Sequence, residues 1–428
     1  MFLVASLSLY PADRVALGVT SFRDTDNLSS NSGSSVDPAI AASGDNVYVA
    51  WSDKTLGNPE IIFRASMDGG ETFTAKSKGR LSNTDSASVT PRVASNGDSV
   101  YVVWVERGSS AKTDIYLRAS HNSGASFENI KNLSNSGTAA EPQVATTGDH
   151  VYIAWSDSMS GNRDVYLISS GNGGESFDDP INLSKNGGVS DQPQISATED
   201  GHVYVTWRDS ISGSKEILFR ASNDNGNTFG EIKNISNNAG SSSNPEISAS
   251  DDAVYITWTD NTIGNVEVFF AASTNGGGSF SSPINLSDTA GTSYRVQIAA
   301  VGDKVYVAWR DTPREVYIRI SENAGDIFAD SVNLSNDEAD SGWPEISAIG
   351  DSVYIVWRAG PVEGFSKEVY AQASEDGGNS FDGVVNLSDN PGNSGPPQVA
   401  AGSGGNIFVV WSDTSTGSGD IYFKSRLG

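Results

Sequence analysis

Tryptophan recurs along this chain at a nearly constant interval. Eight of the nine tryptophans each end a short run of β-branched and aromatic residues such as VYVAW, and they stand 48 to 54 residues apart, at Trp51, Trp104, Trp155, Trp207, Trp258, Trp309, Trp357 and Trp411. A period of about 40 to 50 residues is typical of radial or solenoid repeats. A length of 428 residues would otherwise suggest about three domains. The period instead predicts a single array over residues 19–428.

Each repeat has the pattern of four short strands. In the second repeat, Pro91 opens the first strand, the run that ends at Trp104 is the second, and residues 114–120 are the third. The fourth strand begins at a phenylalanine and runs to Asn-Leu-Ser in most repeats. Proline at the first residue of a strand loses no interior ladder bond, and Gly-Asp turns separate the first two strands. We therefore expect one four-stranded antiparallel sheet per repeat.

The turn between the third and fourth strands has a fixed motif, which in the first repeat runs from Ser66 to Phe73 as SMDGGETF. Matching copies start at Ser120, Ser170, Ser222, Ser273, Ser321 and Ser374. Asp or Asn at the third position can bond the backbone of its own turn, glycine supplies a positive φ, and the final aromatic ring packs between sheets. The motif therefore predicts architecture and not chemistry.

The ends of the chain complement each other. The eighth repeat has a third strand near residues 420–425 but no fourth, whereas residues 22–29 have the same step from Phe to Leu-Ser as Phe127 to Ser134. A ring that pairs its two ends leaves no exposed sheet edge. We therefore predict an all-β, eight-bladed β-propeller of four-stranded antiparallel blades, closed by an N-terminal strand that completes the last blade.

The repeated turn resembles the Asp-box of bacterial neuraminidase repeats, and residues 22–428 resemble the sialidase-like superfamily of Asp-box propellers, including its non-catalytic, lectin-like surface relatives. For an enzyme, the resemblance implies three arginines around a sugar carboxylate, a Tyr with a Glu, and an Asp acid/base. The first of those arginines lies in an F/Y-R-I-P signature. The nearest string here, Phe22-Arg23-Asp24-Thr25, departs from it at Ile and Pro. No catalytic residue is therefore assigned.

The amino-acid composition limits the classes of partner that the protein can bind. Asp and Glu number 53 against 27 Lys and Arg, which gives a formal net charge of -26. Such a charge opposes nucleic acids and anionic membrane surfaces. Cysteine is absent, so no thiol nucleophile or Cys-based metal site exists. Residues 1–18 begin with a short apolar run that is either the remnant of a signal segment or an N-terminal strand, and it is too short to span a bilayer. We expect no membrane insertion.

One sector breaks the repeat. Arg310 and Arg358 follow their tryptophans where four other repeats have Ser or Thr, Arg295 precedes a valine that replaces the usual proline, and Trp343 is the only tryptophan outside the series. Arginine forks suit carboxylate, sulfate or phosphate groups, and an exposed Trp suits a sugar face. The hypothesis is an acidic-glycan site at these four residues with Glu345 nearby. The alternative is that the arginines pair with Asp311 and neighbouring carboxylates.

Two further sets of polar residues recur. The residues that follow the prolines should line the central channel, namely Arg92, Gln143, Gln194, Glu246, Gln297, Glu345 and Gln398. Carboxylates face each other across the hairpins between second and third strands, as in the pairs Asp53 with Glu60, Asp157 with Asp164, and Asp260 with Glu267. Such pairs either bind Ca²⁺ through oxygen atoms or cap turns. No cofactor is required by the sequence.

Seven N-x-S sequons occupy equivalent positions, at Asn27, Asn132, Asn182, Asn234, Asn285, Asn333 and Asn386. In an exported protein they are acceptors for N-glycans. The alternative is that these asparagines end their strands and recur only because the repeat was duplicated.

These features favour an exported or cell-surface propeller that binds an extracellular glycan or a surface protein on the face opposite the Asp-boxes. A sialidase-type exo-glycosidase is the first alternative, although the sequence leans against an enzyme. A structural scaffold or adhesin of a cell-surface layer is the second.

Overall fold

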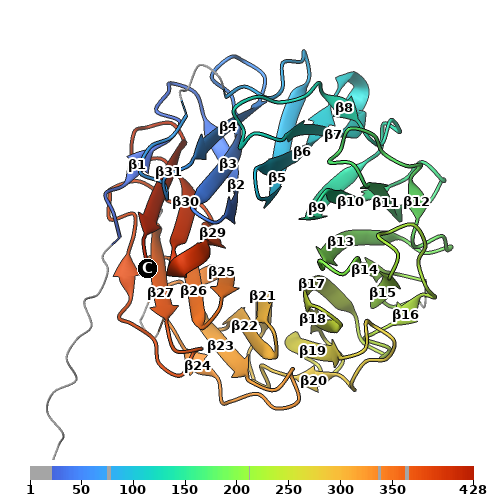
Figure 1. Ribbon diagram of the computed structural model, residues 1–428. Helices are drawn as coiled ribbons and strands as arrows, with labels where there is room; N and C mark the ends of the chain where they lie inside the picture. Colours follow the sequence, from blue (N-terminus) through green and yellow to red (C-terminus); the bar gives the residue numbers. More distant parts are fainter. Residues whose placement is uncertain (1–21, 75–78, 212, 336–338, 362–365) are drawn as a thin grey trace, which may run out of the picture.

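The computed structural model describes residues 22–74, 79–211, 213–335, 339–361 and 366–428. It contains eight antiparallel sheets arranged in a ring, and Figure 1 shows one strand of each sheet, β2, β5, β9, β13, β17, β21, β25 or β29, facing the central axis. The predicted eight-bladed β-propeller is confirmed. The predicted signal segment or strand at residues 1–18 lies outside the described residues.

The first four blades consist of β2 (Ser35–Ser43), β3 (Asn46–Asp53) and β4 (Glu60–Ser66); β5 (Ala87–Asn96), β6 (Ser99–Arg107), β7 (Thr113–Ser120) and β8 (Lys131–Asn132); β9 (Ala140–Thr147), β10 (His150–Asp157), β11 (Asp164–Ser170) and β12 (Ile181–Asn182); and β13 (Ser190–Ala197), β14 (Val203–Asp209), β15 (Glu216–Ser222) and β16 (Lys233–Asn234). Within each blade, neighbouring strands in this order are paired.

The last four blades consist of β17 (Ser242–Ser250), β18 (Ala253–Asp260), β19 (Glu267–Ser273) and β20 (Ile284–Asn285); β21 (Ser293–Val301), β22 (Lys304–Asp311), β23 (Glu315–Ser321) and β24 (Val332–Asn333); β25 (Gly342–Ile349), β26 (Ser352–Ala359), β27 (Glu368–Ser374) and β28 (Val385–Asn386); and β29 (Gln398–Ala401), β30 (Ile407–Asp413) and β31 (Asp420–Arg426) with β1 (Asp26–Asn27). Among the described residues, two short 3₁₀ turns, η2 (Ser109–Ala111) and η3 (Ser403–Gly405), lie in loops.

The core lies between adjacent blades. The second strand of each blade is almost fully buried, and one representative cluster joins Tyr101 and Leu117 of blade 2 to Val151 and Trp155 of blade 3. Alternating side chains on the two faces of a blade fill the two neighbouring interfaces. The recurring tryptophans are therefore packing residues, each at most 1% exposed.

The two ends of the chain share one sheet, as predicted. β1 pairs with β31, with Asp26 opposite Phe423. Ser29 Oγ donates to Asp420 Oδ1 at 2.6 Å and closes the ring further. Blade 1 departs from the four-stranded pattern, because its fourth strand is reduced to a bridge between Ile62 and Arg80. This is the repeat in which Gly-Arg-Leu-Ser replaces the usual Asn-Leu-Ser ending.

The repeated turn has the hydrogen bonds that its sequence predicts. Ser66 Oγ donates to Asp68 Oδ1 at 2.6 Å and accepts from Gly70 N at 2.8 Å, and Thr72 N donates to Asp68 Oδ1 at 2.8 Å. Gly70 has a φ of 80°. The ring of Phe73 packs edge-on against Phe423 of the preceding blade, with centroids 4.9 Å apart. The turn thus joins blades, and its Ser66 and Asp68 side chains are occupied by hydrogen bonds of the turn itself.

No described helix has the length and apolar character that a membrane crossing needs.

Candidate functional site

A ring of seven residues surrounds one mouth of the channel, and we call it the mouth ring. Each lies in the innermost strand of its blade and has a positive φ between 49° and 58°, and they are Asp37, Thr90, Glu141, Gln192, Asn244, Arg295 and Trp343. The strand pairing shifts register at each of these positions, which is the signature of a β-bulge. Left-handed backbone at residues other than glycine costs free energy and clusters at functional sites.

In blades 2 to 7, the residue two positions after each mouth-ring member belongs to the predicted channel lining, which we call the channel ring (Arg92, Gln143, Gln194, Glu246, Gln297, Glu345 and, from blade 8, Gln398). Arg92, Gln143, Gln194 and Glu246 line a common pocket. Burial raises the pKa of Glu345 to about 7. A hydrogen bond from Gln398 and the positive charge of Arg92 act in the opposite direction but do not cancel this rise. Burial and the charge of Glu345 raise the pKa of Glu246. Charges from three blades therefore interact across the channel.

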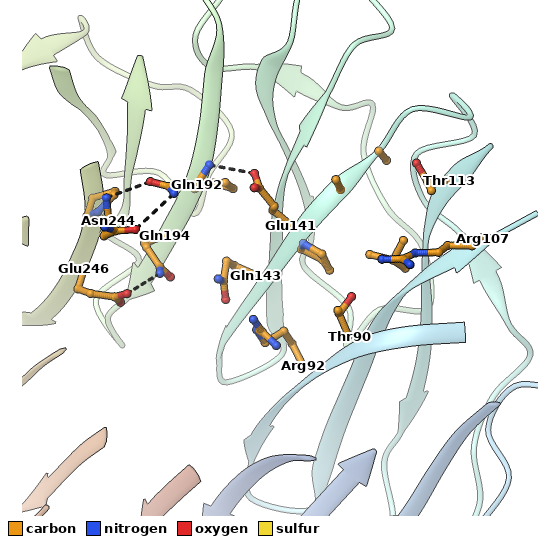
Figure 2. A pocket seen from close by; sticks show the side chains of 16 residues that line it. Thr90, Arg92, Arg107, Thr113, Glu141, Gln143, Gln192, Gln194, Asn244 and Glu246 are labelled. Atoms are coloured by element: carbon orange, nitrogen blue, oxygen red, sulfur yellow. Dashed lines mark hydrogen bonds between the residues drawn. The ribbon is translucent and has the colours of Figure 1, made fainter. Parts of the chain in front are cut away.

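The pocket at this mouth has a volume of about 410 Å³ and is lined by strands of blades 2 to 5 (Figure 2). Polar contacts connect its blades: Gln192 N donates to Glu141 Oε2 at 3.0 Å, and Asn244 N donates to Gln192 Oε1 at 2.9 Å. Gln194 Nε2 donates to Glu246 Oε1 at 3.0 Å. The walls are therefore held in place by their own hydrogen bonds.

A cluster of positive charge lies in blades 6 and 7, and we call it the basic cluster (Arg310, Arg314, Arg358 and Lys367 around Asp340). Arg310 Nη2 and Lys367 Nζ contact the two Asp340 oxygens at 2.7 and 3.0 Å, and Arg314 Nε lies 3.9 Å away. Burial opposes ionisation of Asp340, but the Lys367 hydrogen bond and the nearby cations hold its pKa below the usual value. Among the described residues, three cations share this one carboxylate, and Arg358 makes no ion pair.

Two guanidinium groups of the basic cluster keep unused donors. The Nε atoms of Arg310 and Arg358 are buried and have no hydrogen-bond acceptor among the described residues. Within the described part of the chain, Arg358 Nη2 donates only to a neutral group, Asn393 Oδ1, at 3.0 Å. A small cavity of about 50 Å³ lies between these arginines and Trp343. Buried donors of this kind favour an added acceptor.

The predicted ligand residues separate into two groups. Arg310, Arg358 and Trp343 line one cavity, and the Arg295 guanidinium lies 3.5 Å from the centre of the Trp343 ring, which is 38% exposed. Glu345 belongs instead to the channel ring. The alternative prediction was that these arginines pair with Asp311 and neighbouring carboxylates. Arg310 does form an ion pair, and its partner is Asp340 and not Asp311.

Arg208 of blade 4 shows what a satisfied arginine looks like at the same position after the tryptophan. Its Nε and Nη2 atoms donate to the two oxygens of Asp191 at 2.7 and 2.5 Å. Arg310 and Arg358 have no such two-pronged contact among the described residues. The three arginines occupy equivalent positions, but the residue opposite each one on the inner strand of its own blade differs, as Asp191, Tyr294 and Gly342.

The carboxylate pairs predicted for calcium do face each other across their hairpins, as Asp53 with Glu60, Asp157 with Asp164, and Asp260 with Glu267. Their oxygens accept protein donors. Asp157 accepts from Trp155 Nε1 at 3.0 Å and from Ser136 Oγ and Thr138 Oγ1 at 2.6 Å each. Such contacts are those of the capping alternative, and calcium binding stays a prediction.

The sequon asparagines lie at the ends of fourth strands. Asn182 Oδ1 accepts from Lys185 N at 2.7 Å, and its Nδ2 donates to Asp164 Oδ2 at 2.8 Å. The same bond to the residue three positions on occurs at Asn27, Asn132, Asn234, Asn285 and Asn386. Glycosylation at these sites stays a prediction.

The described residues contain one group of three side chains with metal-ligand spacing, Asp200, His202 and Asp252, on the face that carries the Asp-boxes. His202 Nδ1 lies 3.2 and 3.4 Å from the two carboxylates. The same kind of contact links Lys304 to Asp351 at 2.7 Å across the next but one blade interface. A polar contact between neighbouring blades therefore accounts for the proximity of Asp200, His202 and Asp252 without a bound ion.

No family model matches this chain, and no curated protein is a significant match. Solved structures do match. The polysaccharide lyase Uly1 has 11% identity and a TM-score of 0.51 over 78% of this chain and 89% of that one. A prolyl endopeptidase has 11% identity and a TM-score of 0.51 over 89% of this chain and 54% of that one.

The NanB sialidase from Streptococcus pneumoniae has 9% identity and a TM-score of 0.45 over 96% of this chain and 98% of that one. The likeness is one of fold. At such identities it says nothing about which residues of this chain bind a ligand, so the function has to be inferred from the site itself.

The mouth ring and half of the basic cluster, Arg314 and Lys367, were not among the site residues predicted from the sequence. The signal for the mouth ring was present, since six of its seven members directly precede the prolines that mark the first strands. No comparable signal identifies Asp340 or Lys367. Each comes from a different loop of blade 7, Asp340 from the loop before β25 and Lys367 from the loop before β27.

Proposed function

We propose that this protein is an exported or cell-surface propeller that binds an acidic extracellular glycan at the mouth of its channel. The supporting observation is the basic cluster: in a chain of net charge -26, four cations gather around one described carboxylate, and two of them keep buried, unused Nε donors. Charge-assisted bonds from arginine suit a sugar carboxylate or sulfate. The exposed ring of Trp343 lies beside them.

A glycan array tests this proposal. Wild-type protein should bind carboxylated or sulfated glycans and not their neutral counterparts, and the variant Arg310→Met should lose that preference. Binding of neutral glycans alone, or of none, would contradict the proposal. Self-assembly or cell coating without any glycan binding would favour a surface scaffold instead.

A sialidase-type hydrolase is a second candidate, supported by one observation. Glu345 has a pKa of about 7, so it holds a proton near neutral pH, as a general acid for glycoside cleavage must. The test is release of fluorophore from a fluorogenic sialoside by wild type and by Glu345→Gln. Absence of turnover by the wild-type protein across a substrate panel would remove this candidate.

A further inference from the structure

Five members of the mouth ring form a continuous arc over five consecutive blades, and we call it the mouth arc (Glu141, Gln192, Asn244, Arg295 and Trp343). All five have a φ between 53° and 58° at the same position of the innermost strand. The bulge at each position turns the side chain out of the regular pleat. The same β-bulge in five consecutive blades thus places five different side chains next to one another around the channel.

Neighbouring members contact each other at both ends of the mouth arc. The first three members are joined through backbone N–H groups that donate to Glu141 and Gln192, and Gln192 Nε2 also lies 3.4 Å from Asn244 Oδ1 (Figure 2). At the other end, Arg295 stacks on Trp343 at 3.5 Å. The arc is thus a preformed surface with a carboxamide-rich end and a cationic, aromatic end.

The two ends of the mouth arc differ in charge. The pocket beside its first three members contains two arginines, Arg92 and Arg107, and two glutamates, Glu141 and Glu246. Its formal charges therefore cancel. The other end adjoins the basic cluster, where positive charge exceeds negative among the described residues. A ligand that fits both ends needs an uncharged part and an anionic part.

The pocket also offers donors that the protein leaves unused. The side chains of Gln143 and Arg107 line it and make no hydrogen bond or ion pair within the described part of the chain. The pocket volume of about 410 Å³ is within the roughly 300–1,000 Å³ of small-molecule sites. Carboxamide, guanidinium and carboxylate groups around such a space match the hydroxyl groups of a sugar ring.

We propose that the ligand is an oligosaccharide lying along the mouth arc, with its anionic sugar at the basic cluster and its uncharged sugars in the pocket of blades 2 to 5. This inference rests on the proposed function and narrows it. A chain of several sugars can contact both ends of the mouth arc at once, whereas a single terminal sugar can occupy only one end.

The test compares short and long probes by isothermal titration calorimetry. The probes are free sialic acid against sialyllactose, and glucuronate against a hyaluronan hexasaccharide, in which charged and uncharged sugars alternate. The longer probe of at least one pair should bind about tenfold more tightly or better, which is about 1.4 kcal/mol. The variant Arg358→Met should weaken both members of that pair.

Variants of the pocket separate this inference from the proposed function. Gln143→Ala and Arg107→Met remove side chains that have no partner among the described residues, so these variants should fold normally and weaken only the longer probe. Lys54→Met, at the exposed position of blade 1 that is equivalent to Arg107 and lies outside the arc, is the matched control and should change neither. If affinity is independent of probe length while Arg358→Met still weakens binding, the inference is wrong and the proposed function stands. If no acidic probe binds, both are wrong.

Discussion

At the scale of single residues, the same side chain has a different role in different blades because its neighbours differ. Arg208 is neutralised by both oxygens of Asp191, whereas Arg358 donates only to an amide among the described residues. Removal of a satisfied buried acceptor or donor costs free energy. The consequences of a substitution therefore depend on contacts that the repeat pattern does not contain.

The first prediction concerns Asp157. Its oxygens accept from the buried Trp155 indole and two hydroxyls. Replacement by alanine leaves these donors without their acceptor, so we expect the free energy of unfolding to fall by about 1–3 kcal/mol. Urea denaturation measures it. Asp179→Ala, at an exposed residue of the same blade, is the control and should change stability by less than about 0.5 kcal/mol.

The second prediction concerns Glu345. Its pKa is about 7 in the folded protein against 4.5 for the free side chain. The folded state therefore holds this proton more tightly, so the contribution to stability is complete below about pH 4.5 and is lost as pH rises through about 7. Urea midpoints at several pH values should decline over this window in wild type. In Glu345→Gln the decline should be smaller, and an unchanged slope would contradict the assignment.

At the scale of elements, the Asp-box turn and the blade interface each tolerate variation that the repeats themselves display. Asn replaces Asp in four copies of the turn, and Asn122 Nδ2 then donates to Ser126 Oγ at 2.8 Å while its Oδ1 accepts from Ser126 N. The turn keeps its geometry but loses its charge. The side chain at the third position of the turn therefore titrates only in the Asp copies.

The third prediction follows from that restriction. Asp68 and Asp376 have pKa values of about 2, because hydrogen bonds from Ser and Thr hydroxyls and the turn backbone outweigh the desolvation that would raise them. A depressed pKa contributes stability above about pH 3.8 that is lost as pH falls toward 2. The double variant Asp68→Asn and Asp376→Asn should fold at pH 7 and lose less stability between pH 4 and pH 2. Equal acid sensitivity of the two proteins would refute this.

The fourth prediction uses an apolar pocket of about 490 Å³ at the interface of blades 7 and 8, lined by Phe22, Ala371 and Ile407. Equivalent third-strand positions carry larger side chains, as at Leu117. Ala371→Leu should fill the pocket and raise the free energy of unfolding by about 0.5–2 kcal/mol. The reverse change, Leu117→Ala, should lower it by about 2–5 kcal/mol. Destabilisation by Ala371→Leu would show that the pocket cannot accept a larger side chain.

At the scale of the whole molecule, local repetition made the fold predictable and the site only partly so. The tryptophan period and the turn motif gave eight blades, and the match between residues 22–29 and other fourth strands gave the ring closure. Arg310, Arg358 and Trp343 were visible because they interrupt the repeat.

Asp340 and Lys367 were not predictable, because their importance arises from contacts between side chains that approach from separate loops. The mouth ring was missed for a different reason. A residue before proline favours extended backbone, whereas Asn244 and its equivalents have a positive φ that only the bulged inner strand imposes.

The central claim is that unused arginine donors in blades 6 and 7 bind the negative group of a glycan. Calorimetric titration with the tightest acidic glycan from the array, on wild type, Arg358→Met and Arg208→Met, tests it most directly. We predict that Arg358→Met weakens binding at least tenfold while Arg208→Met, at the equivalent but fully paired position, leaves the affinity unchanged. Equal affinity of the wild type and Arg358→Met would contradict the account.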